Sequence, residues 1–386
     1  MTNPYFGLPD HCFWSRAMTL PAPGRIDPVV RAAAFIDPLH KVATMGSCFA
    51  QHLARHIQMQ GLHYFVPEIP PEDMTKQEAV RLNYGVFSAR YGNVYTVRQA
   101  LQLFYRAFGI FQPQDDVWAK KQGFVDAFRP QINPVEEATV EAVRDARQSH
   151  LSHVRDVFVQ SDWIVFTLGL TEAWQSRLDG AVYPVAPGVS GGTYDPQYYD
   201  FINFDCRQVV QDLTELIRRI GEVNPRCRIL LTVSPVPLIA TYEPRHVWVS
   251  TTYSKAVLRV AAEEATKAFP NVFYFPSYEV ITSPAAGGKY YADDLRQVTD
   301  IGVKHVMRLF TAHYIEANTA GVVGEVSSPA VIRDDTTLVS SAAPQTPHPT
   351  PDKIATAEMS RPILPDMIVC DEEVIEQTMR EHGFSH

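Results

Sequence analysis

The chain lacks any long apolar run. None of its hydrophobic stretches approaches the eighteen or so uninterrupted apolar residues that a membrane-spanning helix needs, so we expect no membrane span. The first ten residues contain neither a basic segment followed by an apolar one nor an Arg-rich amphipathic pattern. We therefore expect no export signal and a cytoplasmic location.

Cysteine is scarce, and basic residues are outnumbered. The five cysteines have no CxxC spacing, which argues against a disulfide framework and a zinc site; they are Cys12, Cys48, Cys206, Cys227 and Cys370. Against 34 lysines and arginines stand 43 aspartates and glutamates, a formal net charge of −9, and no basic patch is visible. Because such a chain repels a polyphosphate backbone, we expect no nucleic-acid partner.

Short apolar runs alternate with segments of helical period over most of the chain. This alternation predicts an α/β fold in which parallel strands are joined by crossover helices. The predicted strands are Val42 to Met45, Trp163 to Leu168, Ile229 to Val233 and Val272 to Phe275. The predicted helices include Val97 to Phe108, Glu136 to Val157, Arg207 to Ile220, Tyr253 to Phe269 and Thr299 to His313.

The composition also indicates how the chain is divided into a domain, a linker and a C-terminal helix. Residues 1–320 are predicted to form one α/β domain, with a helical cap inserted at about 60–160. The aromatic and Gly-rich segment Tyr183 to Phe204 has no periodicity and is interpreted as a long ordered loop. Residues 321–366 are rich in Pro, Ser and Thr and predict a linker, and residues 367–386 predict a short C-terminal helix.

The most informative local feature is Gly46-Ser-Cys-Phe-Ala50, which follows the first predicted strand. A serine at the carboxyl end of a buried strand, directly before a helix, exposes its oxygen in the crevice where α/β proteins bind ligands. Unpaired N–H groups of the helix lie beside it and can stabilise an oxyanion. Ser47 is therefore either a nucleophile or simply a helix cap, since serine is a preferred residue at that position.

Five segments in the same order resemble the GSCFA domain family: Gly46 to Ala50, Tyr91 to Thr96, Thr167 to Trp174, Val233 to Pro237 and Tyr274 to Glu279. The resemblance runs from about Asn3 to Tyr314. That family looks like a branch of the SGNH superfamily of serine esterases and acyltransferases. The resemblance implies a three-layer α/β/α sheet of SGNH (flavodoxin-like) type, a nucleophile after the first strand, oxyanion donors at later strand ends and an Asp-x-x-His pair near the last helix.

The resemblance assigns roles residue by residue. Ser47 matches the nucleophile, and Gly92 with Asn93 matches the second block of oxyanion and substrate residues. The third block falls at Gly169, Thr171 and Glu172, where the wider superfamily has an asparagine. The Thr171 hydroxyl is the substitute expected for that donor.

The last block departs from the Asp-x-x-His pattern, because Asp294 is followed three residues later by Gln297. An amide cannot accept the serine proton near neutral pH. Three explanations stay open: an inactive chain, natural or made so deliberately; a base supplied from elsewhere; or a mechanism without a side-chain base. His246, on the loop after the third predicted strand, is the leading alternative base.

Two rival chemistries compete with a serine nucleophile. Cys48 adjoins Ser47 at the same helix N-terminus, where the helix dipole favours a thiolate, although a small buried thiol is the commoner fate of such a residue. His52 and His56 have the spacing of metal ligands on one helical face, but Leu53 replaces the glutamate of the zincin motif. No metal is expected.

The sequence thus predicts an esterase or O-acyltransferase that acts through a Ser47 acyl-enzyme on a carbohydrate or another hydroxylated small molecule. Acetyl is the default acyl group, and no cofactor is expected beyond an acyl donor such as acetyl-CoA as substrate. The aromatic and acidic residues between Tyr183 and Phe204 suit a sugar ring or pack against their own loop. The alternatives are a ligand-binding or complex-forming protein without turnover, and a scaffold that binds a partner protein through its C-terminal tail.

Overall fold

A computed structural model describes residues 3–30, 34–315 and 368–381, and at its centre lies a four-stranded parallel sheet. The strands are β1 (Val42–Gly46), β4 (Trp163–Leu168), β8 (Arg228–Val233) and β9 (Val272–Tyr274), in the order β1-β4-β8-β9. These are the four strands predicted from the sequence. The α/β class is therefore confirmed, whereas its SGNH type stays a prediction.

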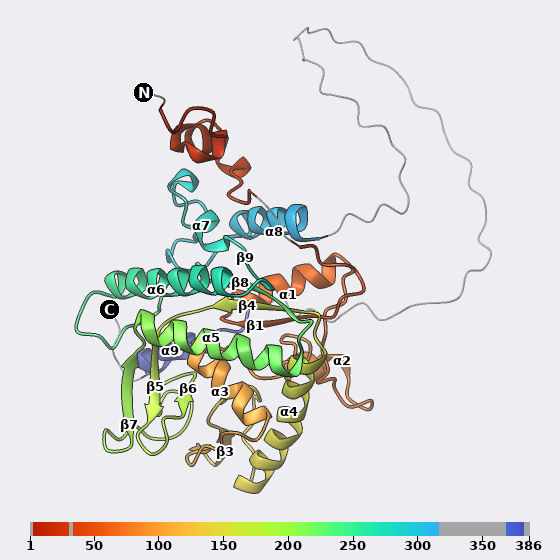
Figure 1. Ribbon diagram of the computed structural model, residues 1–386. Coiled ribbons are helices and arrows are strands. Elements are labelled where there is room, and N and C mark those ends of the chain that lie inside the picture. The colour runs from red at the N-terminus through yellow and green to blue at the C-terminus, as the bar shows by residue number, and fades with distance from the viewer. Residues whose placement is uncertain (1–2, 31–33, 316–367, 382–386) are drawn as a thin grey trace, which may run out of the picture. The chain divides into compact units, whose positions relative to one another are not determined.

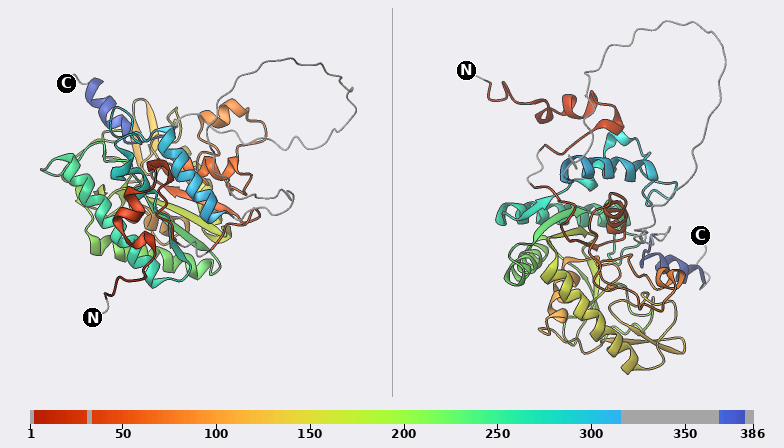
Figure 2. Two further views of the ribbon diagram at one scale, coloured as in Figure 1. Left: turned by 90° about the horizontal axis from the view of Figure 1, so that it is seen from above. Right: turned by 90° about the vertical axis from the view of Figure 1, so that its right-hand side faces the viewer.

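Helices cover both faces of the sheet (Figure 1). Side chains such as Met45, Phe166 and Leu231 point to one face, which packs against α3 (Val97–Ala107), α4 (Val140–Gln160), α5 (Cys206–Val223) and α6 (Val247–Ala268). Alternate residues such as Val42 and Val165 point to the other face, which packs against α1 (Ala50–Met59), α7 (Ser277–Ile281) and α8 (Asp300–Tyr314). In the right view of Figure 2, α8 lies above the sheet and α4 below it.

Capping residues set where several of these helices begin. Thr96 and Asp205 each accept a hydrogen bond from the N–H three residues on, and the side-chain oxygens of Gln99 and Gln208 accept the N–H of the cap residue. Such capping boxes satisfy two donors that a helix start otherwise leaves unpaired. Thr299 caps α8 in the simpler way, through its hydroxyl oxygen. Local sequence therefore determines these helix boundaries.

The insertion between β1 and β4 is only partly helical. Besides α2 (Lys76–Arg81), α3 and α4 it contains an antiparallel hairpin of β2 (Val117–Lys120) and β3 (Gly123–Asp126). The helical cap predicted at about 60–160 therefore also contains a β-hairpin that was not predicted. Trp118 and Val125, on paired residues of the hairpin, are buried in a small separate core.

The aromatic segment predicted as a loop contributes two strands. β6 (Val182–Tyr183) and β7 (Tyr199–Asn203) flank β5 (Glu172–Ser176) in a three-stranded antiparallel sheet. Tyr183 and Tyr199 are buried in the same small core as the hairpin. Residues 184–198 form the predicted loop, but the prediction is wrong at both ends of the segment, because pairing with β5 orders residues there that have no periodicity of their own.

The remaining described elements are short. They are helical turns at Asp10–Cys12, Ser15–Thr19, Pro23–Arg25 and Pro284–Ala286, and the C-terminal α9 (Glu373–Glu381). The predicted linker at 321–366 lies outside the described residues. None of the helices in the described ranges is long and apolar enough to cross a membrane.

Gly46 is the point where β1 meets β4 most closely. Its φ is +128°, and a Cβ built there would stand 2.1 Å from the carbonyl oxygen of Thr167. Backbone on the neighbouring strand cannot yield as a flexible side chain can. Only glycine fits at this strand end.

We expect Gly46→Ala to lower the free energy of unfolding by about 3 kcal/mol or more, because the new methyl group forces the two strands apart. The matched control is Gly221→Ala, since a Cβ at this helical glycine meets nothing within 4 Å. That variant should stay within about 1 kcal/mol of the parent or gain stability. Urea unfolding of the three proteins measures the difference, and equal effects of the two substitutions would contradict the close-contact account.

Candidate functional site

The loop after β1 carries Ser47 at the carboxyl edge of the sheet. Its N–H donates to the Thr167 carbonyl (3.1 Å), which extends the β1 to β4 pairing by one residue. The side chain is only 4% exposed, and its Oγ has no hydrogen-bond partner among the described residues. A Cβ built on Gly169 would approach Ser47 Cβ to 3.2 Å, so the glycine leaves room for the serine. A buried hydroxyl without a partner needs a physical explanation.

Asn93 is brought beside this loop by a backbone bond, since the N–H of Val94 donates to the Gly46 carbonyl (2.8 Å). Both donors of Asn93 are directed at one carboxylate oxygen. The Asn93 N–H lies 3.3 Å and its Nδ2 lies 3.0 Å from Asp371 Oδ2. Gly92 adjoins the same oxygen, which lies 3.8 Å from a Cβ built there. The two residues of the predicted second block therefore lie against the carboxylate of Asp371.

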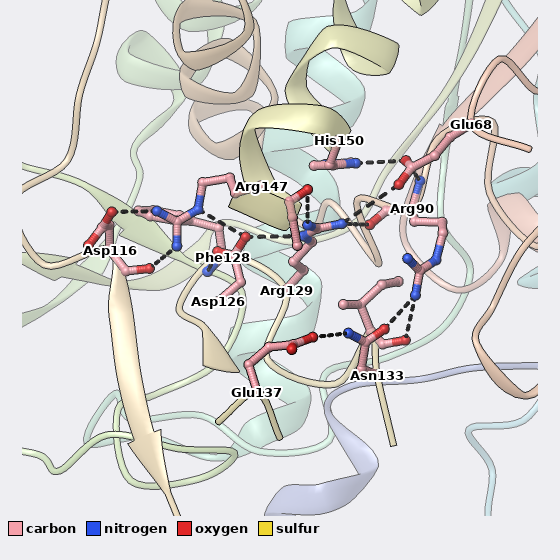
Figure 3. Close-up of polar contacts among 12 residues, drawn as sticks. Glu68, Arg90, Asp116, Asp126, Phe128, Arg129, Asn133, Glu137, Arg147 and His150 are labelled. Atoms are coloured by element: carbon pink, nitrogen blue, oxygen red, sulfur yellow. Dashed lines mark hydrogen bonds and ion pairs between the residues drawn. The ribbon is translucent and has the colours of Figure 1, made fainter. Parts of the chain in front are cut away.

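A buried ion network holds the segment that precedes Asn93 (Figure 3). Glu68 Oε2 accepts the N–H of Arg90 (2.6 Å) and a hydrogen bond from His150 Nδ1 (2.7 Å). Arg129 Nη1 donates to the Arg90 carbonyl (3.2 Å), and its Nε donates to Asp126 Oδ2 (3.0 Å). Both backbone groups of Arg90 are thereby fixed three residues before Asn93.

The network extends to Arg147, whose Nε donates to Asp126 Oδ2 (3.0 Å) and whose other nitrogens bind Asp116. Burial alone would raise the pKa of Asp126, but the charges of Arg147 and Arg129 hold that pKa well below its usual range. The carboxylate is therefore charged and paired on both sides. Since a buried charge is tolerated only when paired, the insertion is locked in one arrangement.

The backbone and side-chain donors of the predicted third block form hydrogen bonds that stabilise the fold. The N–H groups of Gly169 and Leu170 both donate to the Tyr95 carbonyl, at 3.1 and 3.0 Å. Thr171 is fully buried; its N–H donates to Ser254 Oγ (2.9 Å) and its hydroxyl donates to Asn203 Oδ1 (2.7 Å). None of these donors is directed at Asp371. Asn93 thus supplies the two donors that hold the bound carboxylate.

Glu172 turns away toward the segment after β8. Its Oε1 accepts from the Thr241 hydroxyl (2.6 Å) and its Oε2 from the Tyr242 N–H (3.2 Å). Burial raises the pKa of this carboxyl. Next to it, Trp174 contacts Tyr242 and Tyr194 edge-on, with ring centroids 4.8 and 5.1 Å apart. Tyr194 and Tyr242 are 42% and 62% exposed, so this aromatic cluster faces solvent.

The predicted acid and base residues lie on the turn before α8. Asp294 is exposed, and its Oδ1 accepts the N–H groups of Arg296 (3.0 Å) and Gln297 (2.9 Å), so this oxygen stabilises its own turn. Gln297 lines a cavity of about 360 Å³ together with Cys48 and His52. The structure therefore brings Gln297 to the Gly46 to Ala50 loop, but neither residue contacts Ser47 Oγ.

His246 caps a helix. It precedes α6, and its Nδ1 accepts the N–H of Trp248 (3.1 Å). The side chain is exposed and does not line the cavity that holds Cys48 and Gln297. In the structure His246 thus has a capping role, and its role as an alternative base stays a prediction.

The C-terminal segment, residues 368–372, lies directly on the site, and sequence reasoning missed it. Gln51 donates from Nε2 to the Val369 carbonyl (2.6 Å) and accepts the Val369 N–H at Oε1 (2.9 Å). The N–H of Asp371 donates to the Tyr95 hydroxyl (3.1 Å), and Glu372 pairs with Arg296 (3.0 Å). The only local signal is three consecutive acidic residues after Cys370.

A family model for the GSCFA family matches residues 41–310, well over half of the chain. The chain belongs to the GSCFA family. A comparison with curated proteins found no match. The GSCFA region includes Ser47, Asn93, Asp294 and Gln297, whereas the C-terminal segment lies beyond its end. In this GSCFA protein, residues from outside the family region therefore cover the site.

Burial strongly shifts the pKa values of titratable groups in the C-terminal segment and of Lys255 near it. Desolvation lowers the pKa of Lys255 to about 8, and its Nζ donates to the Gly169 carbonyl (2.6 Å). Burial also raises the pKa of Asp371 to about 6 and that of Glu372 to about 7. A titratable cluster with such shifts, at the carboxyl edge of a parallel sheet, has the character of a functional site.

The Glu68 pair predicts a pH dependence of stability. Burial opposes its charge, but the hydrogen bond from His150 and the charge of Arg129 lower the pKa of Glu68 to about 2. A pKa below its unfolded value stabilises the protein above about pH 4.3, and this contribution is lost as the pH falls through 2. We expect Glu68→Gln to cost about 3 kcal/mol at pH 7 and progressively less toward pH 2.

Urea unfolding of both proteins between pH 7 and pH 2 measures this difference. Glu78→Gln is the control, because Glu78 pairs with Arg81 on the surface and its loss should cost no more than about 1 kcal/mol. A Glu68→Gln difference that is constant with pH would show that Glu68 is not held as a carboxylate.

Proposed function

We propose that the chain transfers or hydrolyses an acyl group, by default acetyl, at the site formed by Ser47 and Asn93. The observation that carries the proposal is the carboxylate of Asp371 held by both donors of Asn93, beside a buried serine hydroxyl without a partner. A carboxylate oxygen resembles the oxyanion of an acyl-transfer intermediate in charge. Two N–H donors aimed at such an oxygen are what an oxyanion site requires.

The proposed reaction passes through an acyl-enzyme. Ser47 Oγ attacks the acyl carbonyl carbon, the carbonyl oxygen takes the place of Asp371 Oδ2 at Asn93, and the alcohol or thiol of the donor leaves with the serine proton. Water or an acceptor hydroxyl then releases the acyl group. The C-terminal segment must leave first, because Asp371 occupies the donors.

A carbohydrate or another hydroxylated acceptor is supported by the aromatic cluster of Trp174, Tyr194 and Tyr242. Two of its rings are exposed next to Glu172, and aromatic faces beside carboxylates suit sugar rings. An acyl donor such as acetyl-CoA would then be a second substrate. We expect Trp174→Ala to raise KM for the acceptor with little effect on hydrolysis of a small aryl ester.

The nucleophile is tested by labelling with a fluorophosphonate. We expect the probe to modify Ser47 in a Gln297→His background, and Ser47→Ala to abolish the modification while the neighbouring substitution Cys48→Ala preserves it. Mass spectrometry of the labelled peptide identifies the residue. Modification of a different serine, or survival of the label in Ser47→Ala, would contradict the assignment.

The missing base is tested by Gln297→His. Gln297 lines the same cavity as Cys48, so a histidine there is close to the nucleophile loop. We expect turnover of a small aryl acetate to rise by roughly two to four powers of ten, the range for a positioned general base. Asp293→His, on the same exposed turn, is the matched control and should leave turnover unchanged.

A second candidate function is binding of an acylated or carboxylate ligand without turnover. It is favoured by one observation: Gln297 cannot act as a base, while the Asn93 donors still bind an anion. No gain in turnover for Gln297→His, combined with saturable binding of a carboxylate ligand to the parent chain, would favour this alternative.

A further inference from the structure

Two cysteines that are far apart in the sequence meet at the edge of the site. Cys48 follows Ser47, Cys370 belongs to the C-terminal segment, and each thiol shifts the pKa of the other. Both line the cavity of about 360 Å³, together with Arg296 and Gln297. Both are free thiols in the structure. The described contacts thus assemble a thiol pair from residues that have no spacing motif.

The surroundings of Cys370 favour a thiolate. Arg296 Nη2 lies 3.7 Å from Cys370 Sγ and also binds Glu372 Oε2 (3.0 Å), and the Tyr95 hydroxyl lies 3.9 Å from the sulfur. The neighbouring Cys48 thiol and the positive charge of Arg296 lower the pKa of Cys370, although burial opposes this. Thiolates at such electropositive, partly exposed positions are the reactive ones.

Cys48 differs from Cys370 both in its burial and in the direction of its pKa shift. It is 6% exposed, and the neighbouring Cys370 together with burial raises its pKa. Cys370 is only partly buried and reaches the cavity. One accessible thiolate backed by one buried thiol is the arrangement of an attacking and a resolving cysteine.

We propose that Cys48 and Cys370 form a redox-active dithiol that exchanges with small-molecule disulfides. The Cys370 thiolate attacks one sulfur of the small disulfide, whose S–S bond breaks, so that a mixed disulfide forms and one thiolate leaves. Cys48 then attacks Cys370 Sγ, gives up its proton to solvent or to the leaving thiolate, and releases the second small thiol. Two electrons pass from the protein to the small disulfide, which is reduced to two thiols.

This dithiol does not depend on the acyl-transfer proposal, but it affects the same site. A Cys48–Cys370 disulfide would tie the C-terminal segment covalently to the nucleophile loop. Asp371, the next residue, would then be retained on the Asn93 donors. Reduction would leave the segment held by its hydrogen bonds and the Arg296 pair alone.

The experiment uses the full chain, reduced and then incubated with glutathione disulfide at pH 7. We expect a loss of two of the five titratable thiols and, in non-reducing peptide mapping, a cross-linked pair that contains Cys48 and Cys370. Retention of all five thiols, or a cross-link to any other cysteine, would overturn the proposal. This measurement needs no substitution, so it holds even if a variant folds poorly.

Single substitutions distinguish the attacking role of Cys370 from the resolving role of Cys48. Cys48→Ser should stop at one glutathione on Cys370, whereas Cys370→Ser should take up none at Cys48. Cys206→Ser is the matched control and should still lose two thiols. Arg296→Gln should slow the first step about tenfold, and Arg296→Lys should restore part of the rate, because the cation favours the thiolate. Glutathione on Cys48 in Cys370→Ser would reverse the assigned roles and contradict the proposal.

Discussion

The backbones of β1 and β4 approach each other at Gly46 so closely that no side chain fits between them. The parallel pairing therefore continues past the strand, and the Ser47 N–H still binds the Thr167 carbonyl. The Gly46 carbonyl, on its other side, accepts the N–H of Val94. One backbone contact thus brings the serine and the donors of Asn93 together from segments that are more than forty residues apart. The chemistry proposed for the site depends on this contact.

Charge pairing keeps the second half of the site in place. Arg90 is held through its N–H by Glu68 and through its carbonyl by Arg129, and both partners are buried. A paired network in a low-dielectric interior is rigid, because moving one member leaves another charge without compensation. Asn93 therefore presents its donors without having to be ordered by the ligand, which is the condition for strong stabilisation of an oxyanion.

The C-terminal segment binds mainly through polar groups. Gln51, Asn93, Tyr95 and Arg296 all contact it, and each of these contacts can be replaced by a ligand of similar polarity. Individual hydrogen bonds contribute only about 1 kcal/mol each in exchange with water. A substrate can therefore compete with the segment, whereas a covalent bond between the two thiols would prevent that competition.

Much of the fold follows from the sequence alone. Three of the central strands, β1, β4 and β8, are mostly apolar runs buried on both faces, and the bounds of all four agree with the prediction to within one residue. Helix starts such as those of α5 and α8 are determined by local capping residues, Asp205 and Thr299. Ser47 could be located at a strand end for the same reason, since the residue that follows a buried strand is set by local pattern.

The other features of the fold and the site were decided by the tertiary structure, because these features depend on contacts between distant segments. The strand β7 pairs with β5 across residues 177–198, and this pairing brings Asn203 to the Thr171 hydroxyl. Residues 368–372 have neither periodicity nor a spacing motif, and their partners Asn93 and Gln51 lie 278 and 318 positions earlier than the residues they bind. Sequence determines burial and helix boundaries because these are local, whereas the partner of a buried donor or thiol is set by which chain segments the fold brings together.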